Sequence, residues 1–251
     1  MSHRFRFIGE KDAGALWQLV GEEAHHLAKV LRLEEGAAVE VTDARGVWAL
    51  GTVVRIGAKA VAIEATDEFR EAAPDVRLAF AIGALKPGAV DDILPALTEL
   101  GVDTVHVFLQ KESAKSRLTD KVAERWQRIL VQALKQCKRA RLPAIVEHGS
   151  LAALLHETAG DAETRRYMLA AGAARPLGEL LRQGGPGRGV LLVAGGEKGL
   201  IPDEEAALFE AGFCAASLGP HVLRAVTAAV AAVAVATDWR ESLAAPPPKP
   251  S

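Results

Sequence analysis

Two glycine-containing segments are the first candidates for chemistry in this chain of 251 residues. Residues 195–199 read Gly-Gly-Glu-Lys-Gly and follow an apolar run. Glycine has no Cβ, so such a segment can bring its backbone close to a ligand and adopt positive φ values. The segment matches neither the GxGxxG dinucleotide pattern nor the GxxxxGK[ST] phosphate loop. Taken alone, it fits a ligand-binding loop and a plain strand-to-helix turn about equally well.

The second segment, residues 218–224, reads Leu-Gly-Pro-His-Val-Leu-Arg. A Gly-Pro pair at the exit of a strand predicts a sharp loop. Arg224 would then begin a helix that otherwise contains mainly Ala and Val. A lone cation among apolar residues usually has an assigned partner. Arg224 is therefore either a cation that acts on a ligand or one half of a salt bridge that fixes the helix.

The third candidate is a basic stretch, residues 111–141, with ten Lys or Arg and three acidic residues. The whole chain has a formal net charge of -2, so positive charge is concentrated in this stretch. Four of its cations share helical spacing and hence one face: Arg117, Lys121, Arg125 and Arg128. Solvated helix faces usually mix charge signs, whereas one-signed clusters suit nucleic-acid phosphates. We predict phosphate contacts here, with a solvated face as the alternative.

Residue spacing gives little support to other kinds of site. His25 and His26 are adjacent, but no cysteine or third histidine lies at ligand spacing, so we expect no metal. Asp91 and Asp92 open an expected helix, where their charges suit the helix dipole. A carboxylate pair for acid–base catalysis is the weaker alternative for these two residues. No Ser-His-Asp signature is visible.

The cysteines and the apolar runs bear on the compartment. Cys137 and Cys214 do not make a disulfide framework, so we expect reduced thiols in a cytoplasmic protein. Residues 1–7 lack the apolar core of a signal peptide. The uncharged run at residues 225–236 is shorter than the about 20 apolar residues that span a bilayer. We therefore expect no membrane partner.

These segments must be positioned by a larger framework, and residues 76–243 predict a parallel sheet. Near-continuous apolar strands separated by helices are typical of such a sheet with helices on both faces. Strands are expected at residues 78–82, 104–108, 167–171, 190–194 and 214–218. Helices are expected at residues 90–100, 118–136, 177–182, 203–211 and 225–236. Ligands bind at the carboxyl ends of such strands, so the expected loops begin near residues 83, 109, 172, 194 and 219.

Residues 1–72 read as a small, mostly β domain. Apolar alternation predicts strands at residues 39–42, 47–56 and 60–65. A helix is expected at residues 22–31, with Leu27, Val30 and Leu31 on one face. Residues 68–74 are charged, end in Pro and look like a linker. The Pro-rich residues 244–251 are expected to be a disordered tail.

Together these features resemble the RsmE family of bacterial 16S rRNA (uracil-N3)-methyltransferases, in the SPOUT superfamily, over nearly the whole chain. Residues 25–32, followed by Gly36 and Asp43, look like the opening of that family's PUA-like domain. Residues 98–102 match its Thr-Glu-Leu-Gly segment, and residues 126–143 follow its pattern of Trp, Gln, Arg and Pro. The segments at residues 195–199 and 218–227 correspond to its two glycine loops. The order and spacing of these motifs make the match specific.

The resemblance implies an α/β fold, a SPOUT-type trefoil-knotted parallel sheet domain at residues 76–243, preceded by a PUA-like RNA-binding β domain at residues 1–72. Knots are otherwise almost absent from proteins. The resemblance also implies that the two glycine loops bind S-adenosylmethionine at the interface of a homodimer. The predicted cofactor-binding residues are Ala194, Gly195, Gly196, Glu197, Gly199, Leu218, Gly219, Pro220, Leu223 and Arg224. The predicted RNA-binding residues are His25, Arg32, Lys111, Lys115, Arg117, Arg125, Arg128, Lys138, Arg139 and Arg141.

The implied reaction is methylation of N3 of a uridine in 16S rRNA, as free RNA or in the small ribosomal subunit. Loss of the N3 proton places charge on O2 and O4 of uracil, and a nearby cation would stabilise it. Arg224 is the predicted catalytic cation, and Glu197 would orient Arg224 or the cofactor. The target base must also leave its stack to reach the pocket.

The chain departs from the family pattern mainly at polar positions. The unusual residues are Pro95, Ala96, Lys135, Gly196, Lys198, His221, Ala225 and Val226. They leave open a second class of function, an RNA-binding ribosome-assembly protein with a decayed methyltransferase site. A third class, a small-molecule nucleotide-binding enzyme, would not need the basic stretch.

The Ala and Val run at residues 225–236 also predicts a homodimer. A helix that is apolar on every face must be buried, and the sheet of its own chain covers one face only. A second copy of the helix in a twofold pair would cover the other face. Coverage by residues 1–72 is the alternative.

Overall fold

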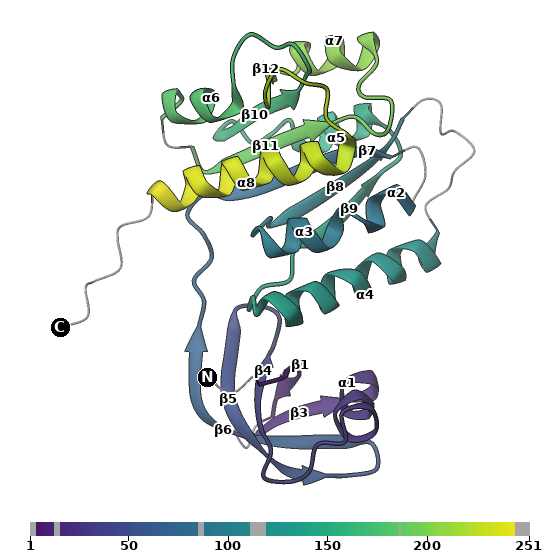
Figure 1. Cartoon of the computed structure of the whole chain (residues 1–251), viewed down its shortest axis with the longest axis vertical. Helices are drawn as coiled ribbons and strands as arrows, with labels where there is room; N and C mark the ends of the chain where they lie inside the picture. The colour runs from purple at the N-terminus through teal and green to yellow at the C-terminus, as the bar shows by residue number, and fades with distance from the viewer. Residues whose placement is uncertain (1–3, 13–15, 85–87, 111–118, 186, 244–251) are drawn as a thin grey trace, which may run out of the picture. The chain divides into compact units, whose positions relative to one another are not determined.

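The computed structural model describes residues 4–12, 16–84, 88–110, 119–185 and 187–243, which divide into two compact units (Figure 1). The first unit contains the described residues up to Ala73 together with Val131–Leu142. The predicted division at residues 72–76 leaves this second segment in the other domain. The predicted tail at residues 244–251 and the predicted RNA contacts Lys111, Lys115 and Arg117 lie outside the described residues.

The first unit is built on a six-stranded sheet with the order β1-β4-β5-β6-β3-β2. Its strands are β1 (Arg6–Ile8), β2 (Glu10–Lys11), β3 (Leu16–Val20), β4 (Ala38–Thr42), β5 (Val47–Ile56) and β6 (Ala60–Arg70). The three strands expected from apolar alternation are confirmed, and their inward residues, such as Val41 and Ile63, are fully buried. The linker expected from residue 68 is wrong at its start, because β6 continues to Arg70 and Phe69 stacks on Trp48 of β5.

The helix expected at residues 22–31 forms with a different geometry. It comprises α1 (Gly21–His25) and a π-helical turn, η1 (His26–Val30), in which the Leu31 amide donates to the His26 carbonyl. The wider i→i+5 turn breaks the spacing of an α-helical face. Leu27 is therefore buried and Leu31 packs on the core, but Val30 points to solvent with 60% of its surface exposed. The predicted common face of Leu27, Val30 and Leu31 is therefore wrong for Val30.

The second unit contains a sheet of six strands with the order β12-β10-β11-β7-β8-β9, and every neighbouring pair is parallel (Figure 1). Its strands are β7 (Arg77–Ala84), β8 (Thr104–Leu109), β9 (Ala144–His148), β10 (Thr164–Leu169), β11 (Gly189–Ala194) and β12 (Cys214–Ala216). The parallel α/β sheet and the small β unit before it agree with the predicted fold class. Strand β9, an edge strand, was not predicted, because its apolar run covers only residues 144–146 and ends at Glu147.

Helices cover both faces of this sheet. They include α2 (Gly88–Asp91), α3 (Leu94–Glu99), α5 (Leu151–Thr158), α6 (Leu177–Gln183), α7 (Pro202–Glu210) and α8 (Ala225–Leu243). Helix α4 (Asp120–Cys137) begins in this unit, but its residues from Val131 onward belong to the first unit. Helix α8 crosses one face and contacts α3 and α6, whereas α5 and α7 pack against each other on the opposite face (Figure 1). Of the described helices, none is long and apolar enough to cross a membrane.

The single helix expected at residues 90–100 is wrong, because two short helices occupy this segment. Helix α2 ends at Asp91 and α3 begins at Leu94, with Pro95 in its first turn. Proline has no amide hydrogen and disfavours a helical conformation for the residue before it, so a helix tends to start there rather than continue through it. Helix α5 was also not predicted, although Ser150 caps it by accepting a hydrogen bond from the Ala153 amide.

Candidate functional site

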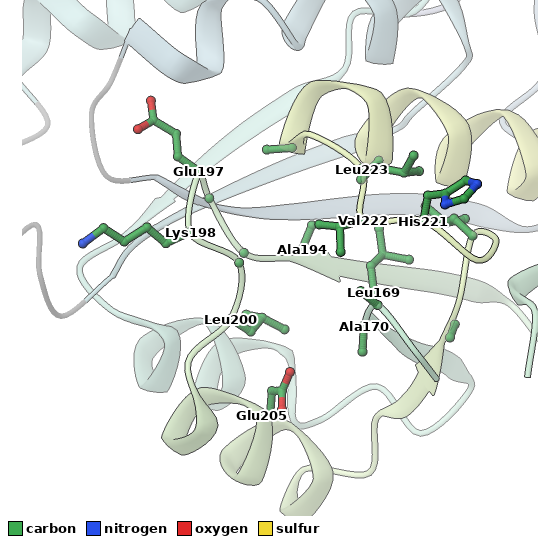
Figure 2. Close-up of a pocket in the computed structure, with 18 of the residues that line it drawn as sticks. Leu169, Ala170, Ala194, Glu197, Lys198, Leu200, Glu205, His221, Val222 and Leu223 are labelled. Atoms are coloured by element: carbon green, nitrogen blue, oxygen red, sulfur yellow. The ribbon is translucent and has the colours of Figure 1, made fainter. Parts of the chain in front are cut away.

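A pocket of about 350 Å³ lies at the carboxyl ends of β10, β11 and β12 (Figure 2). Three segments surround it: residues 169–171 at the end of β10, the glycine loop at residues 195–200 after β11, and residues 218–223 apart from Pro220 after β12. Parallel strands end on one edge of a sheet, so loops far apart in sequence meet there. The two segments singled out by their glycines therefore face one cavity.

Most of the predicted cofactor-binding residues line this pocket. They are Ala194, Gly195, Gly196, Glu197, Gly199, Leu218, Gly219 and Leu223. Pro220 is not among the described residues that line it, and Arg224 lines a neighbouring pocket instead. Figure 2 shows Glu205, which was not predicted, pointing from α7 towards the cavity. Cofactor binding by these residues stays a prediction, to which the structure adds their convergence.

The glycine loop is folded tightly on itself. A Cβ atom at Gly195 would lie 2.0 Å from the Gly199 carbonyl carbon, and one at Gly196 would lie 2.4 Å from the Gly83 carbonyl oxygen. The Gly199 amide donates to the Gly196 carbonyl at 3.0 Å, and Gly199 adopts a φ of +77°. Close backbone approach and positive φ both require glycine here. The loop is thus more constrained than an ordinary strand-to-helix turn.

A second pocket, of about 330 Å³, shares Gly196, Glu197 and Ala225 with the first. Apolar side chains form much of its wall, and its charged residues are Asp92, Glu197 and Arg224. Arg224 is exposed and forms no ion pair with any residue that the structure describes. The described residues therefore do not support the interpretation of Arg224 as one half of a salt bridge. A cation at a second pocket beside the first suits a catalytic role.

The adjacent carboxylates Asp91 and Asp92 have different surroundings. Asp91 accepts a hydrogen bond from the indole of Trp126 at 2.9 Å and pairs with Arg125 at 3.2 Å. These contacts join α2 to α4 and give Asp91 a structural role. Asp92 instead lines the second pocket. The two residues thus do not form a carboxylate pair that acts on one ligand.

The predicted RNA-binding residues in α4 and just after it differ in how firmly they are held. Arg128 is exposed and its guanidinium donates to the Glu124 carbonyl at 3.3 Å. Lys138 forms an ion pair with Glu40 at 2.8 Å, and Arg141 donates to the Glu71 carbonyl at 2.8 Å. The contacts of Lys138 and Arg141 are structural, within the first unit. RNA binding by any of them stays a prediction, and Arg128 is the least constrained of these three.

The ion pair of Lys138 belongs to a buried network. Arg6 is 6% exposed, pairs with Glu40 at 3.0 Å and donates to the carbonyls of Lys138 and Arg139. Burial alone would raise the pKa of Glu40, but Lys138 and Arg6 outweigh it and lower that pKa below the usual value. The network holds the segment that follows α4 against β1 and β4.

The remaining predicted RNA contacts are His25, Arg32 and Arg139. His25 and Arg32 are exposed near η1, and Arg32 adopts a positive φ of 52° just after that turn. Arg139 is half-buried. No group of three or more His, Cys, Asp or Glu side chains that could hold a metal ion occurs among the described residues.

Sequence reasoning missed several residues at the site. Gln110 and Glu204 are buried and hydrogen-bonded to the glycine loop or its exit. Gln110 follows the end of β8, one of the five strand ends where ligand-binding loops were expected. Its position in the sequence could therefore have marked it as a candidate site residue. Leu169 and Ala170 were missed because β10 ends two residues earlier than predicted.

Comparison with known proteins identifies both units. Residues 72–237 match the model of the RNA methyltransferase domain family, and residues 19–66 match the RNA methyltransferase PUA domain. Ribosomal RNA small subunit methyltransferase E of Synechocystis is 30% identical over 96% of this chain and 79% of the relative. Its counterpart in Mycobacterium bovis is 31% identical over 88% of this chain and 86% of the relative.

A solved structure shows the same fold. Ribosomal RNA small subunit methyltransferase E of Neisseria gonorrhoeae, bound to S-adenosyl methionine, superposes with a TM-score of 0.80 at 23% identity. The superposition covers 94% of this chain and 98% of that one. The family models, the relatives and the fold agree, and the chain therefore belongs to the RNA methyltransferase family that includes ribosomal RNA small subunit methyltransferase E.

Proposed function

We propose that this protein transfers a methyl group from S-adenosylmethionine to N3 of a uridine in 16S ribosomal RNA. Family membership supports RNA methylation, and the relatives' names support the small-subunit RNA as substrate. The observation that carries the proposal is the convergence of both glycine loops on one pocket, with Arg224 at the pocket beside it.

The first pocket has the size and chemistry that S-adenosylmethionine needs. A cavity of about 350 Å³ falls in the usual range for small-molecule sites. Leu169, Leu218 and Leu223 offer apolar contact, and the backbone of the glycine loop offers hydrogen-bonding groups without side chains in the way. Glu197 and Glu205 place two carboxylates against one lysine, Lys198, which suits a cationic ligand.

The residues of the second pocket suit the acceptor base. S-adenosylmethionine, when bound, supplies an electrophilic methyl group on a positively charged sulfur. Arg224 can hold the uracil oxygens and stabilise the charge that develops there as N3 loses its proton. Apolar Ile82, Ile93 and Val226 can pack against a base that has left its stack. Glu197 lines both pockets and can orient Arg224 or the methyl donor.

We further propose that the protein acts in the cytoplasm as a homodimer, on 16S rRNA or on the small ribosomal subunit. Basic residues of α4 and the first unit would contact RNA phosphates. Val226 of α8 is 38% exposed and Val222 before it is 84% exposed, so this region retains apolar surface for a second copy.

The test is a methyl-transfer assay with purified protein, labelled S-adenosylmethionine and rRNA extracted from a strain that lacks the gene. We expect one uridine to gain a methyl group at N3, which mass spectrometry of nuclease fragments would locate. Tight RNA binding without cofactor binding would instead support the assembly protein with a decayed site. Methylation of a base other than uracil would contradict the proposed substrate.

A further inference from the structure

Gln110 and Glu204 form a buried polar cluster behind the glycine loop, and the proposed mechanism does not use either residue. Gln110 follows β8 and is 6% exposed, whereas Glu204 lies in the first turn of α7 and is 5% exposed. Burying a polar side chain costs free energy unless its polar groups form hydrogen bonds. Their hydrogen-bond partners therefore indicate what the cluster does.

The amide of Gln110 bonds to both ends of the glycine loop. Its oxygen accepts from the Gly196 amide at 3.1 Å. Its nitrogen donates to the Gly199 carbonyl at 3.0 Å and to Glu204 Oε2 at 2.8 Å. The same Glu204 oxygen accepts from the Ile201 amide at 3.1 Å, which fixes the exit of the loop. One glutamine thus ties the start of the loop to its end.

Packing around Gln110 leaves little room for another arrangement. A Cβ atom at Gly83 would lie 2.8 Å from the Gln110 amide carbon, and a Cβ atom at Gly196 would lie 2.9 Å from its oxygen. Glycine at both positions lets the amide plane reach the loop backbone. Glutamate at position 110 would have no hydrogens to donate and would face the carboxylate of Glu204. Asparagine is one methylene shorter.

We propose that Gln110 is a positioning residue that holds the glycine loop in its cofactor-binding shape before the cofactor arrives. Its contacts reach Gly196 and Gly199, which line the first pocket, here called the cofactor pocket. Gly196 also lines the second pocket, here called the base pocket. A loop shaped in advance binds more tightly because less ordering occurs on binding. This inference rests on the proposed function, since it assigns that pocket to S-adenosylmethionine.

The test compares two single variants, Gln110→Ala and Gln110→Glu, with the double variant that combines Gln110→Glu and Glu204→Gln. Calorimetry should show S-adenosylmethionine affinity at least tenfold weaker for both single variants, with rRNA affinity unchanged. The double variant should recover part of the lost affinity, because glutamine at position 204 can donate a hydrogen bond to glutamate at position 110. Hydrogen exchange without ligand should be faster at residues 196–201 in Gln110→Ala than in the parent.

The control is Thr158→Val, which removes a hydroxyl that donates to the Leu154 carbonyl at 2.9 Å within α5. It should lower the thermal midpoint without changing cofactor affinity. The inference would be overturned if a folded Gln110→Ala variant bound the cofactor within twofold of the parent and showed unchanged hydrogen exchange at residues 196–201. If the parent itself does not bind S-adenosylmethionine, the proposed function fails, while the exchange rates still decide whether Gln110 holds the loop.

Discussion

Arg224 is the residue on which the proposed chemistry depends most directly. It is exposed at the base pocket and has no ion-pair partner among the described residues. We expect Arg224→Ala to lower the rate of methyl transfer by a few orders of magnitude, while cofactor affinity and the thermal midpoint change little. Single-turnover kinetics, calorimetry and thermal melting would measure the three quantities. Loss of the cooperative melting transition would show instead that Arg224 is structural.

His106 gives a second prediction at the residue scale, about stability and pH. Its Nδ1 atom lies 2.9 Å from Nε2 of His148, and Nδ1 of His148 lies 3.5 Å from Glu157. Burial, with a smaller effect of His148, lowers the pKa of His106 to about 4 against the opposing influence of Glu157. The unfolded chain therefore takes up this proton near pH 6.5, before the folded chain does. Stability from His106 is complete above pH 6.5 and is lost as the pH falls towards 4.

We expect acidification from pH 7 to 4.5 to cost the protein about 1–3 kcal/mol through this residue, given its partial exposure. His106→Gln should flatten that part of the profile, as measured by urea unfolding at several pH values. His156→Gln, at an exposed position of the same unit, is the control. A profile that is the same in His106→Gln and in the parent would contradict the assignment.

The glycine loop is the element whose shape limits the cofactor site. Any side chain at Gly195 would collide with the backbone at Gly199 and Leu200. We expect Gly195→Val to abolish measurable S-adenosylmethionine binding by calorimetry. Gly149→Ala is the control, because a Cβ atom there meets nothing within 4 Å. A Gly195→Val variant that binds the cofactor as tightly as the parent would show that the site is misplaced.

Helix α4 carries the prediction about RNA. Arg128 is exposed, and among the described residues its guanidinium contacts only a backbone carbonyl of the same helix, so it can reach a phosphate. We expect Arg128→Ala to weaken rRNA binding and to lower the slope of log affinity against log salt by about 0.7–0.9 for the lost contact. Arg188→Ala, which removes an exposed cation of the second unit, should leave the slope unchanged. An unchanged slope in Arg128→Ala would favour a solvated face.

Arg125→Ala tests a different property of the same helix. Its guanidinium pairs with Asp91, so its removal loosens the link between α2 and α4 as well as any phosphate contact. We expect a reduced thermal midpoint together with weaker rRNA binding. Charge reversal at Arg125 would place two carboxylates together and would confuse the two effects.

At the scale of the whole molecule, the homodimer proposal rests on α8. Its buried residues are Ala229, Ala232, Val233, Ala236 and Trp239, which leaves Val230 on a partly exposed face. We expect light scattering at micromolar concentration to give a mass near 53 kDa, twice the 26.5 kDa of one chain. Val230→Glu should produce monomers that lack methyl transfer, whereas Ala206→Glu, at an exposed position of α7, should remain dimeric. An active monomer would end the homodimer proposal.

The sequence by itself determined the fold class and most of its elements. Local backbone geometry sets the residue periods of strands and helices. The succession of apolar strands and helices at residues 76–243 was therefore enough to predict a parallel sheet. Ordered motifs then placed the chain in its family, and glycine placement marked both loops of the cofactor pocket. Local patterns failed at three places: the π-helical turn directs Val30 outward, Pro95 divides a helix, and the edge strand β9 has an apolar run of only three residues.

Only the tertiary structure decided how single polar residues are used. Asp91 and Asp92 are equivalent in sequence, yet Trp126 and Arg125 hold the first while the second lines a pocket. Lys138 and Arg128 are both basic residues of one stretch, but Glu40 engages the first alone. Gln110 has no recognisable motif, because its partners lie 86 and 89 residues away along the chain. Hydrogen bonds and ion pairs depend on side chains that folding brings together, and sequence spacing does not record those distances.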